Sequence, residues 1–161
     1  METLDPSPNE FVVRRVRAAK KSAARAGVAG EWTLVDAASD TWLWRTPPGR
    51  DARGAWESAV RSLHGDDVVL PLLRDRDGVA HYPTGEVTVR FDVAPADDAL
   101  RAFAREHRLT LERRNAYEPR QAVFAPAGPR SDWLPDVVAR LAKAPGVARA
   151  WANTASSYTR A

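Results

Sequence analysis

The chain has 161 residues, which is enough for one ordinary domain or for two small ones with a buried core. Its 24 Lys and Arg against 21 Asp and Glu leave a formal charge of +3, a bias too weak to argue for or against a nucleic-acid partner. The absence of cysteine excludes a disulfide scaffold and a cysteine-based zinc site.

The first residues contain no apolar run of signal-peptide length, and no later segment reaches the roughly 18 apolar residues of a membrane span. The sequence as written therefore predicts a cytoplasmic protein that does not enter a membrane. A secreted protein is expected only if the chain is a fragment of a larger precursor. Residues 1–9 are expected to form a flexible N-terminus.

The first half of the chain predicts the order α-β-β-α-β. Residues 9–27 repeat small apolar side chains at helical spacing, with basic side chains on the opposite side, which predicts a helix. Two short Trp-rich segments, 31–37 and 40–46, predict strands. Residues 54–65 carry a helical apolar stripe, and "DVVLPLLRD" at 67–75 predicts a strand.

The joint between the halves is "RDRDGVAHYPTG", residues 74–85. Asp77-Gly78 is a tight-turn signal, and Pro83 interrupts regular structure. Between them, "VAHY" at 79–82 predicts a short edge strand that forms a hairpin with the preceding strand.

The second half predicts the order β-α-β-β-α-β. "GEVTVRFDV" at 85–93 alternates apolar and polar side chains without a break, which predicts a strand with one buried face. A helix follows over 94–108, then strands at 109–115 and 121–128. Ser131 is the expected N-cap of the last helix, and "VARAWANT" predicts the last strand. This order is the ferredoxin-like arrangement, an α+β fold with four antiparallel strands and both helices on one face.

The two halves repeat one pattern. The helix stripes have the same spacing and an offset of 78 residues, with Trp56, Ala59, Val60 and Leu63 matching Leu134, Val137, Val138 and Leu141. We therefore expect a degenerate ferredoxin-like subdomain at 10–76, which lacks an opening strand, and a complete one at 77–154. An extended tail is expected at 155–161.

An ordered set of short motifs resembles the N-terminal prodomain of subtilisin-like serine proteases, particularly the fervidolysin-like type. The motifs are "PTGEVTVRF" at 83–91, "LTLERR" at 109–114, and "APGV" with "WAN" within 144–153. The resemblance spans about residues 66–158, and the first half fits more loosely the segment that precedes this unit in some precursors. The chain departs from the family in lacking a proline before Asn153, which leaves the direction of the tail open.

The resemblance implies a function for the bare sheet face and for the tail. In the family, this face packs on two surface helices of the protease, and the tail enters the active-site cleft like a substrate. The domain assists folding of the protease and then inhibits it. Carried over, the partner-facing sheet residues are Glu86, Thr88, Arg90, Asp92, Arg113 and Arg149. The partner-facing tail residues are Ala155, Ser156, Ser157, Tyr158 and Thr159, and Tyr158 is the candidate for the main specificity pocket. A frayed C-terminus is the alternative reading of the tail.

The motifs of a catalytic site are missing from the sequence. The three segments that hold the subtilisin-type triad are absent, and the three histidines have neither paired spacing nor a zinc-helix motif. No Gly-rich phosphate loop is present. We therefore expect no enzyme activity, no cofactor and no metal. The resemblance to the prodomains implies a subtilisin-like serine protease as the partner in trans.

Two other functions fit the same fold. RNA-recognition domains share the element order but need outward aromatic side chains on the two central strands, where only Phe124 is a candidate, so nucleic acid is an unlikely partner. The basic side of the 9–27 helix could still hold phosphates. A non-catalytic regulatory or adaptor domain that dimerises through the sheet is the third reading, and the protein is expected to be a monomer or a weak dimer.

Overall fold

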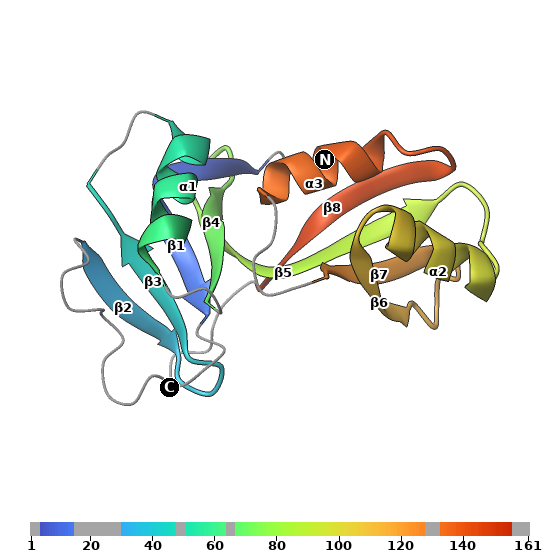
Figure 1. Ribbon diagram of the computed structural model, residues 1–161, viewed down its shortest axis with the longest axis horizontal. Helices are drawn as coiled ribbons and strands as arrows, with labels where there is room; N and C mark the ends of the chain where they lie inside the picture. The colour runs from blue at the N-terminus through green and yellow to red at the C-terminus, as the bar shows by residue number, and fades with distance from the viewer. Residues whose placement is uncertain (1–3, 15–29, 48–50, 64–66, 128–132, 156–161) are drawn as a thin grey trace. The chain divides into compact units, whose positions relative to one another are not determined.

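The structure is a computed structural model that describes residues 4–14, 30–47, 51–63, 67–127 and 133–155. It is a mixed α+β fold with three helices and eight strands in the described residues, and the strands pair antiparallel (Figure 1). The chain divides into two compact units, residues 1–83 with 154–161 (unit 1) and residues 84–153 (unit 2). None of the described helices is long and apolar enough to cross a membrane.

Unit 1 contains the strands β1 (Asp5–Arg14), β2 (Glu31–Asp36), β3 (Thr41–Arg45) and β4 (Val68–Arg74) and the helix α1 (Ala52–Ser62). Their order in the sheet is β2-β3-β1-β4. Asp51 caps α1 by accepting a hydrogen bond from the Gly54 amide at 2.6 Å. The predicted α1 stripe is confirmed, because Ala59 and Leu63 are buried in a core with Phe11 of β1, Trp44 of β3 and Val69 of β4.

The helix predicted over residues 9–27 is wrong in its first part. Residues 5–14 form strand β1, which lies between β3 and β4, and the rest of the predicted helix lies outside the described residues. Phe11, Val12 and Val13 are all buried, because a central strand can be covered on both faces. The first described element of unit 1 is therefore an opening strand, in place of the predicted α-β-β-α-β order.

Unit 2 contains most of β5 (Ala80–Phe91), then α2 (Asp97–Glu106), β6 (Leu109–Arg114), β7 (Gln121–Pro126), α3 (Leu134–Ala142) and most of β8 (Val147–Ala155). The strand order is β8-β5-β7-β6. If the four strands of each unit are numbered by their order along the chain, both sheets have the same order from edge to edge: fourth, first, third, second. The repeat seen in the helix spacing thus extends to the order of the strands.

The joint forms the predicted hairpin, but the prediction that Pro83 ends a short edge strand is wrong, because Pro83 lies within β5. Leu73 pairs with His81 and Arg74 with Ala80, and Gly78 occupies the tight turn with φ of 81°. Asp75 accepts hydrogen bonds from two turn amides and contacts His81 Nε2 at 2.9 Å. Strand β5 continues without a break from this hairpin into unit 2. The division between the units falls within this strand, after Pro83, whereas the sequence predicted a boundary after residue 76.

The helices of unit 2 bury the predicted faces. Leu100 and Ala104 of α2 are buried, and Phe103 contacts the rings of Phe91 and Phe124 at 5.1 and 5.4 Å. In α3, Leu134, Val137 and Leu141 are buried. The predicted N-cap is wrong, because α3 begins at Leu134 with Trp133 as its N-cap, and Ser131 lies outside the described residues.

Candidate functional site: the outer sheet face of unit 2

The outer face of the unit 2 sheet is the side opposite the rings of Phe91 and Phe103. On β5, the side chains of Val87, Val89 and Phe91 point toward the helices, so alternation turns the polar residues between them outward. Register extends this face to β7, where Val123 lies opposite Thr88, and to β6, where Arg113 lies opposite Val123. We call this surface the outer face.

Glu86 and Arg113 form an ion pair across the outer face. Arg113 Nη1 and Nη2 each donate to one carboxylate oxygen of Glu86 at 3.2 Å, a bidentate geometry. The hydrogen bond and charge of Glu86 raise the pKa of Arg113 above its ordinary value. Strand β7 lies between β5 and β6, so the paired side chains of Glu86 and Arg113 reach across β7. They cover Val123, whose side chain faces outward but is only 8% exposed.

Thr88 lies at the centre of the outer face and is buried. Its Oγ1 donates to Asn153 Oδ1 at 2.6 Å, and Thr84 Oγ1 donates to the Asn153 backbone carbonyl at 3.4 Å. Asn153 therefore faces outward on β8, and alternation along the strand places Trp151 and Arg149 on the same side. The guanidinium carbon of Arg149 lies 4.9 Å from the centroid of the Trp151 ring, a cation–π contact.

Arg90 lies beside a carboxylate that another arginine already holds. Arg90 Nη2 is 3.5 Å from Glu118, whereas Arg120 donates to Glu118 at 3.1 Å through both Nε and Nη2. The side-chain and backbone hydrogen bonds from Arg120 lower the pKa of Glu118 to about 2. Glu118 and Arg120 therefore belong to the charged rim of the outer face.

The predicted sheet residues come together in most cases. Glu86, Thr88, Arg90, Arg113 and Arg149 share the outer face. Asp92 follows the end of β5, where its amide donates to the Gly146 carbonyl at 2.9 Å and its side chain is exposed. Of the predicted tail, Ala155 is the last residue of β8, and Ser156, Ser157, Tyr158 and Thr159 lie outside the described residues.

Two residues of the outer face were not predicted from the sequence. Trp151 and Asn153 alternate with Ala150, which is buried, and Ala152. This alternation could have indicated from the sequence that Trp151 and Asn153 face outward. It was hard to recognise, because the inward side chains are small alanines rather than large hydrophobic residues. Phe124, the one aromatic candidate on a central strand, is fully buried and lies opposite Val87 on the inner side. Within residues 84–91 of β5 and in β7, no aromatic side chain faces outward.

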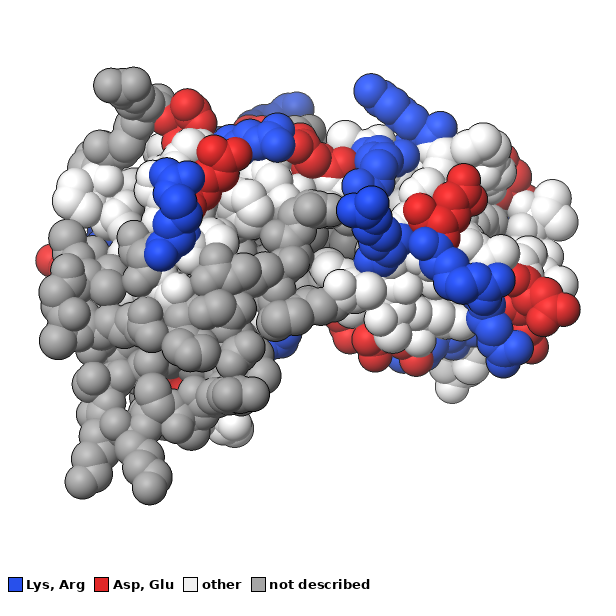
Figure 2. Space-filling model, in the orientation of Figure 1, with Lys and Arg blue, Asp and Glu red and all other residues white. Residues whose placement is uncertain are grey.

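Part of the exposed positive charge of unit 2 lies over its helices. Figure 2 shows a row of Lys and Arg side chains across the region of α2 and α3. The exposed cations on these elements are Arg101, Arg105, Arg108, Arg140 and Lys143. Most lie in or just after a last helical turn, where cations interact favourably with the helix dipole. No group of three or more His, Asp or Glu in the described residues is arranged to hold a metal ion.

The outer face thus presents paired charges, a buried threonine and a half-buried tryptophan beneath an arginine. Such a surface has groups that can bind a protein partner. Comparison with known proteins adds no assignment: the chain matches no family model, no curated protein and no solved structure significantly.

Proposed function

We propose that unit 2 has the ferredoxin-like arrangement and that unit 1 is a divergent copy of it. The support is the β-α-β-β-α-β chain order together with the β8-β5-β7-β6 strand order. Each helix joins two parallel strands that have one strand between them. Right-handed crossovers then bring α2 and α3 to the same face, which leaves the opposite face without a helix.

We propose further that the protein is a non-catalytic module that binds a subtilisin-like serine protease in trans. It would inhibit the protease, assist its folding, or do both. The observation that carries this proposal is the outer face, whose strand β8 runs directly toward the C-terminal segment. A protease groove accepts an extended peptide as an added strand, and the chain is extended up to Ala155 at the end of β8.

Arg149 and Trp151 are the proposed binding hot spot of the outer face. Arginine and tryptophan dominate protein interfaces, since they bury large areas and lose little freedom when already packed together. The other charged groups are paired with each other. A partner therefore gains less from Glu86 and Arg113 than from the Trp151 ring, unless it can replace their ion pair.

An inhibition assay with a truncated chain tests this function. We expect the full chain to inhibit peptide hydrolysis by a subtilisin-like protease and deletion of Ser156 to Ala161 to abolish inhibition while much of the docking remains. Docking is measured separately by calorimetry with the active-site-blocked enzyme. Equal inhibition by the truncated chain would disprove the role of the tail.

Substitutions on β8 test the role of the outer face. Trp151→Ala and Arg149→Ala are expected to weaken docking by at least tenfold, which is about 1.4 kcal/mol. Arg61→Ala is the matched control, because Arg61 is an exposed arginine on α1 in unit 1. If all three variants dock as the unaltered chain does, the partner binds elsewhere.

Nucleic-acid binding is the weaker alternative. The outward side chains of residues 84–91 of β5 and of β7 offer no ring for base stacking, and the row of basic side chains lies over the helices. Binding of a generic oligonucleotide that weakens steeply with salt and is lost in Trp151→Ala would favour this alternative over the protease.

A further inference from the structure

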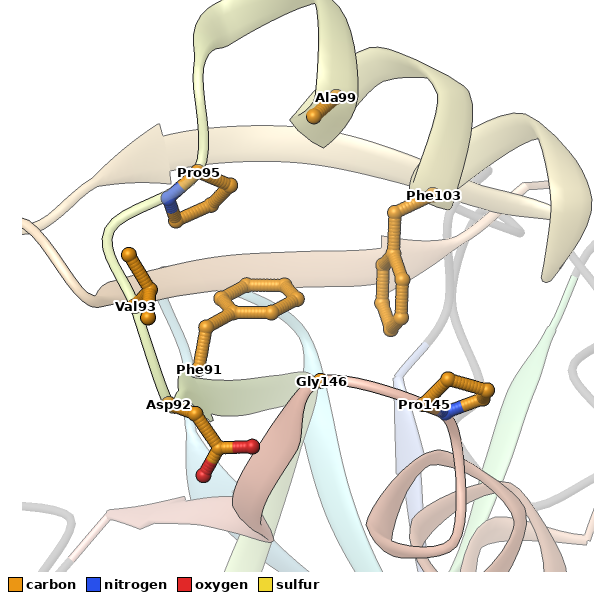
Figure 3. Close-up of a pocket in the computed structure, with 8 residues that line it drawn as sticks. All are labelled: Phe91, Asp92, Val93, Pro95, Ala99, Phe103, Pro145 and Gly146. Carbon is orange, nitrogen blue, oxygen red and sulfur yellow. The ribbon is translucent and has the colours of Figure 1, made fainter.

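An apolar pocket of about 480 Å³ lies where β5 ends, between the start of α2 and the turn after α3. Its walls include Phe91, Val93, Pro95, Ala99, Phe103 and Pro145 (Figure 3). The Phe91 and Phe103 rings meet edge to face at 5.1 Å. Asp92 also lines the pocket, but Figure 3 shows its carboxylate pointing away from these rings, so the part of the pocket around the rings is apolar.

The most exposed large hydrophobic side chains of the described residues lie at this end of unit 2. Val93, in the pocket wall, is 78% exposed, and Tyr117, in the β6–β7 turn, is 99% exposed. The next in rank is Val79 in unit 1, at 55%. Single exposed hydrophobics are ordinary, but an exposed aromatic ring next to an apolar pocket is typical of an interaction surface.

The turn that carries Tyr117 is fixed beside the pocket. Arg114 donates to the Pro95 carbonyl at the pocket wall at 2.6 Å and to the Pro119 carbonyl in the turn at 2.8 Å. Asn115 Oδ1 accepts from the Tyr117 amide at 2.9 Å, which holds the turn closed. Because the backbone is already ordered, inserting the Tyr117 ring into a partner loses little conformational entropy.

We propose that this end of unit 2 is a self-association surface in which Tyr117 of each copy enters the apolar pocket of the other. A two-fold contact requires one patch that is complementary to itself, and this patch holds both an exposed aromatic ring and an apolar pocket. Tyrosine suits the pocket, since its ring is apolar and its hydroxyl can stay in water. The surface adjoins the rim of the outer face at Glu118, but this inference rests on Tyr117 and the pocket and does not depend on the protease proposal.

The dimer is weak. Two tyrosine rings bury about 150–250 Å² each, so their contribution falls well below the roughly 1,200 Å² of a standard interface. Self-association therefore belongs in the range of about 10 μM to about 1 mM, and sedimentation equilibrium of the full chain across that range measures it.

Two variants remove the two halves of the contact. Tyr117→Ala removes the ring, and Ala99→Glu puts a charge at the pocket, and each is expected to weaken dimerisation at least tenfold. Ala99 is exposed and is the third residue of α2, where glutamate is favoured, so the fold is retained; circular dichroism checks this. Val79→Ser is the control that removes an exposed hydrophobic side chain elsewhere.

Mixing the two variants tests the reciprocal geometry. Tyr117→Ala keeps an intact pocket and Ala99→Glu keeps an intact ring, so one of the two contacts can re-form between them. The mixture is expected to associate more tightly than either variant alone. A protein that stays monomeric at about 1 mM, variants that dimerise as the unaltered chain does, or an equal loss in Val79→Ser would each overturn the proposal.

Discussion

Replacing Glu10 by glutamine removes a carboxylate of unit 1 that accepts hydrogen bonds from three side chains. Glu10 is 6% exposed and lies on β1. Arg74 donates to its two oxygens at 2.9–3.1 Å through Nε and Nη2, Ser7 donates at 3.0 Å, and Arg45 lies at 3.3 Å. Burial alone raises the pKa of Glu10, but the hydrogen bonds from Arg74 and Ser7 outweigh it, so the pKa lies below its ordinary value.

The expected loss is about 2–3 kcal/mol of unfolding free energy. Hydrogen bonds to charged groups contribute about 1.5–3 kcal/mol, and Glu10→Gln keeps the shape but replaces one acceptor with a donor facing Arg74. The arginine side chains are 37% and 52% exposed, so water compensates part of the loss. Glu31→Gln is the control, because its ion pair with Arg45 is 4.0 Å long and Glu31 is 83% exposed; we expect less than about 0.5 kcal/mol.

Urea unfolding followed by tryptophan fluorescence is the assay, since Trp32, Trp42, Trp44 and Trp56 all belong to unit 1. A lowered carboxylate pKa stabilises the fold above the unfolded-state pKa of about 4.3, and the effect is lost as pH falls through the folded-state pKa. The difference between the two chains should thus be full at pH 7 and shrink below about pH 4. A loss under about 0.5 kcal/mol at pH 7, or one that persists undiminished in acid, would refute the reasoning.

Three further predictions follow from single contacts. Thr88→Val removes the hydroxyl donor to Asn153 and should cost about 1–2 kcal/mol in urea unfolding; a neutral result would mean that the 2.6 Å bond contributes nothing. Trp56→Phe loses the 2.8 Å indole bond to a β4 carbonyl and should cost about 1–3 kcal/mol, and an unchanged midpoint would contradict this. The Glu118 carboxyl should titrate near pH 2 by carbon-13 NMR and shift upward in Arg120→Ala; a midpoint of about 4.3 in both chains would show that Arg120 does not hold it.

The elements whose apolar residues recur at a clear strand or helix spacing were predicted well from the sequence. Residues 85–93 alternate without a break, and the structure places their valines inward and Glu86 and Thr88 outward. The stripes of α1, α2 and α3 gave the buried helix faces. Strand β1 was missed because a central strand covered on both faces loses its alternation, and a short apolar run then fits a helix equally well.

The contacts of the outer face could not be predicted from local pattern. Glu86 and Arg113 lie on strands that β7 separates, so their pairing depends on strand order and on the register shift in β6 beside Arg113. The same holds for the bond from Thr88 to Asn153, 65 residues apart in the chain. Long-range register decides such pairs, whereas periodicity decides only which face a side chain occupies.

Hydrogen exchange of the full chain with a catalytically inactive subtilisin-like protease tests the central proposal most directly. The account predicts slower exchange in β8 and at residues 86–90 of β5 on adding the protease, with α2 and α3 unchanged. Absence of a complex, or protection confined to α2 and α3 while β8 exchanges as before, would contradict it.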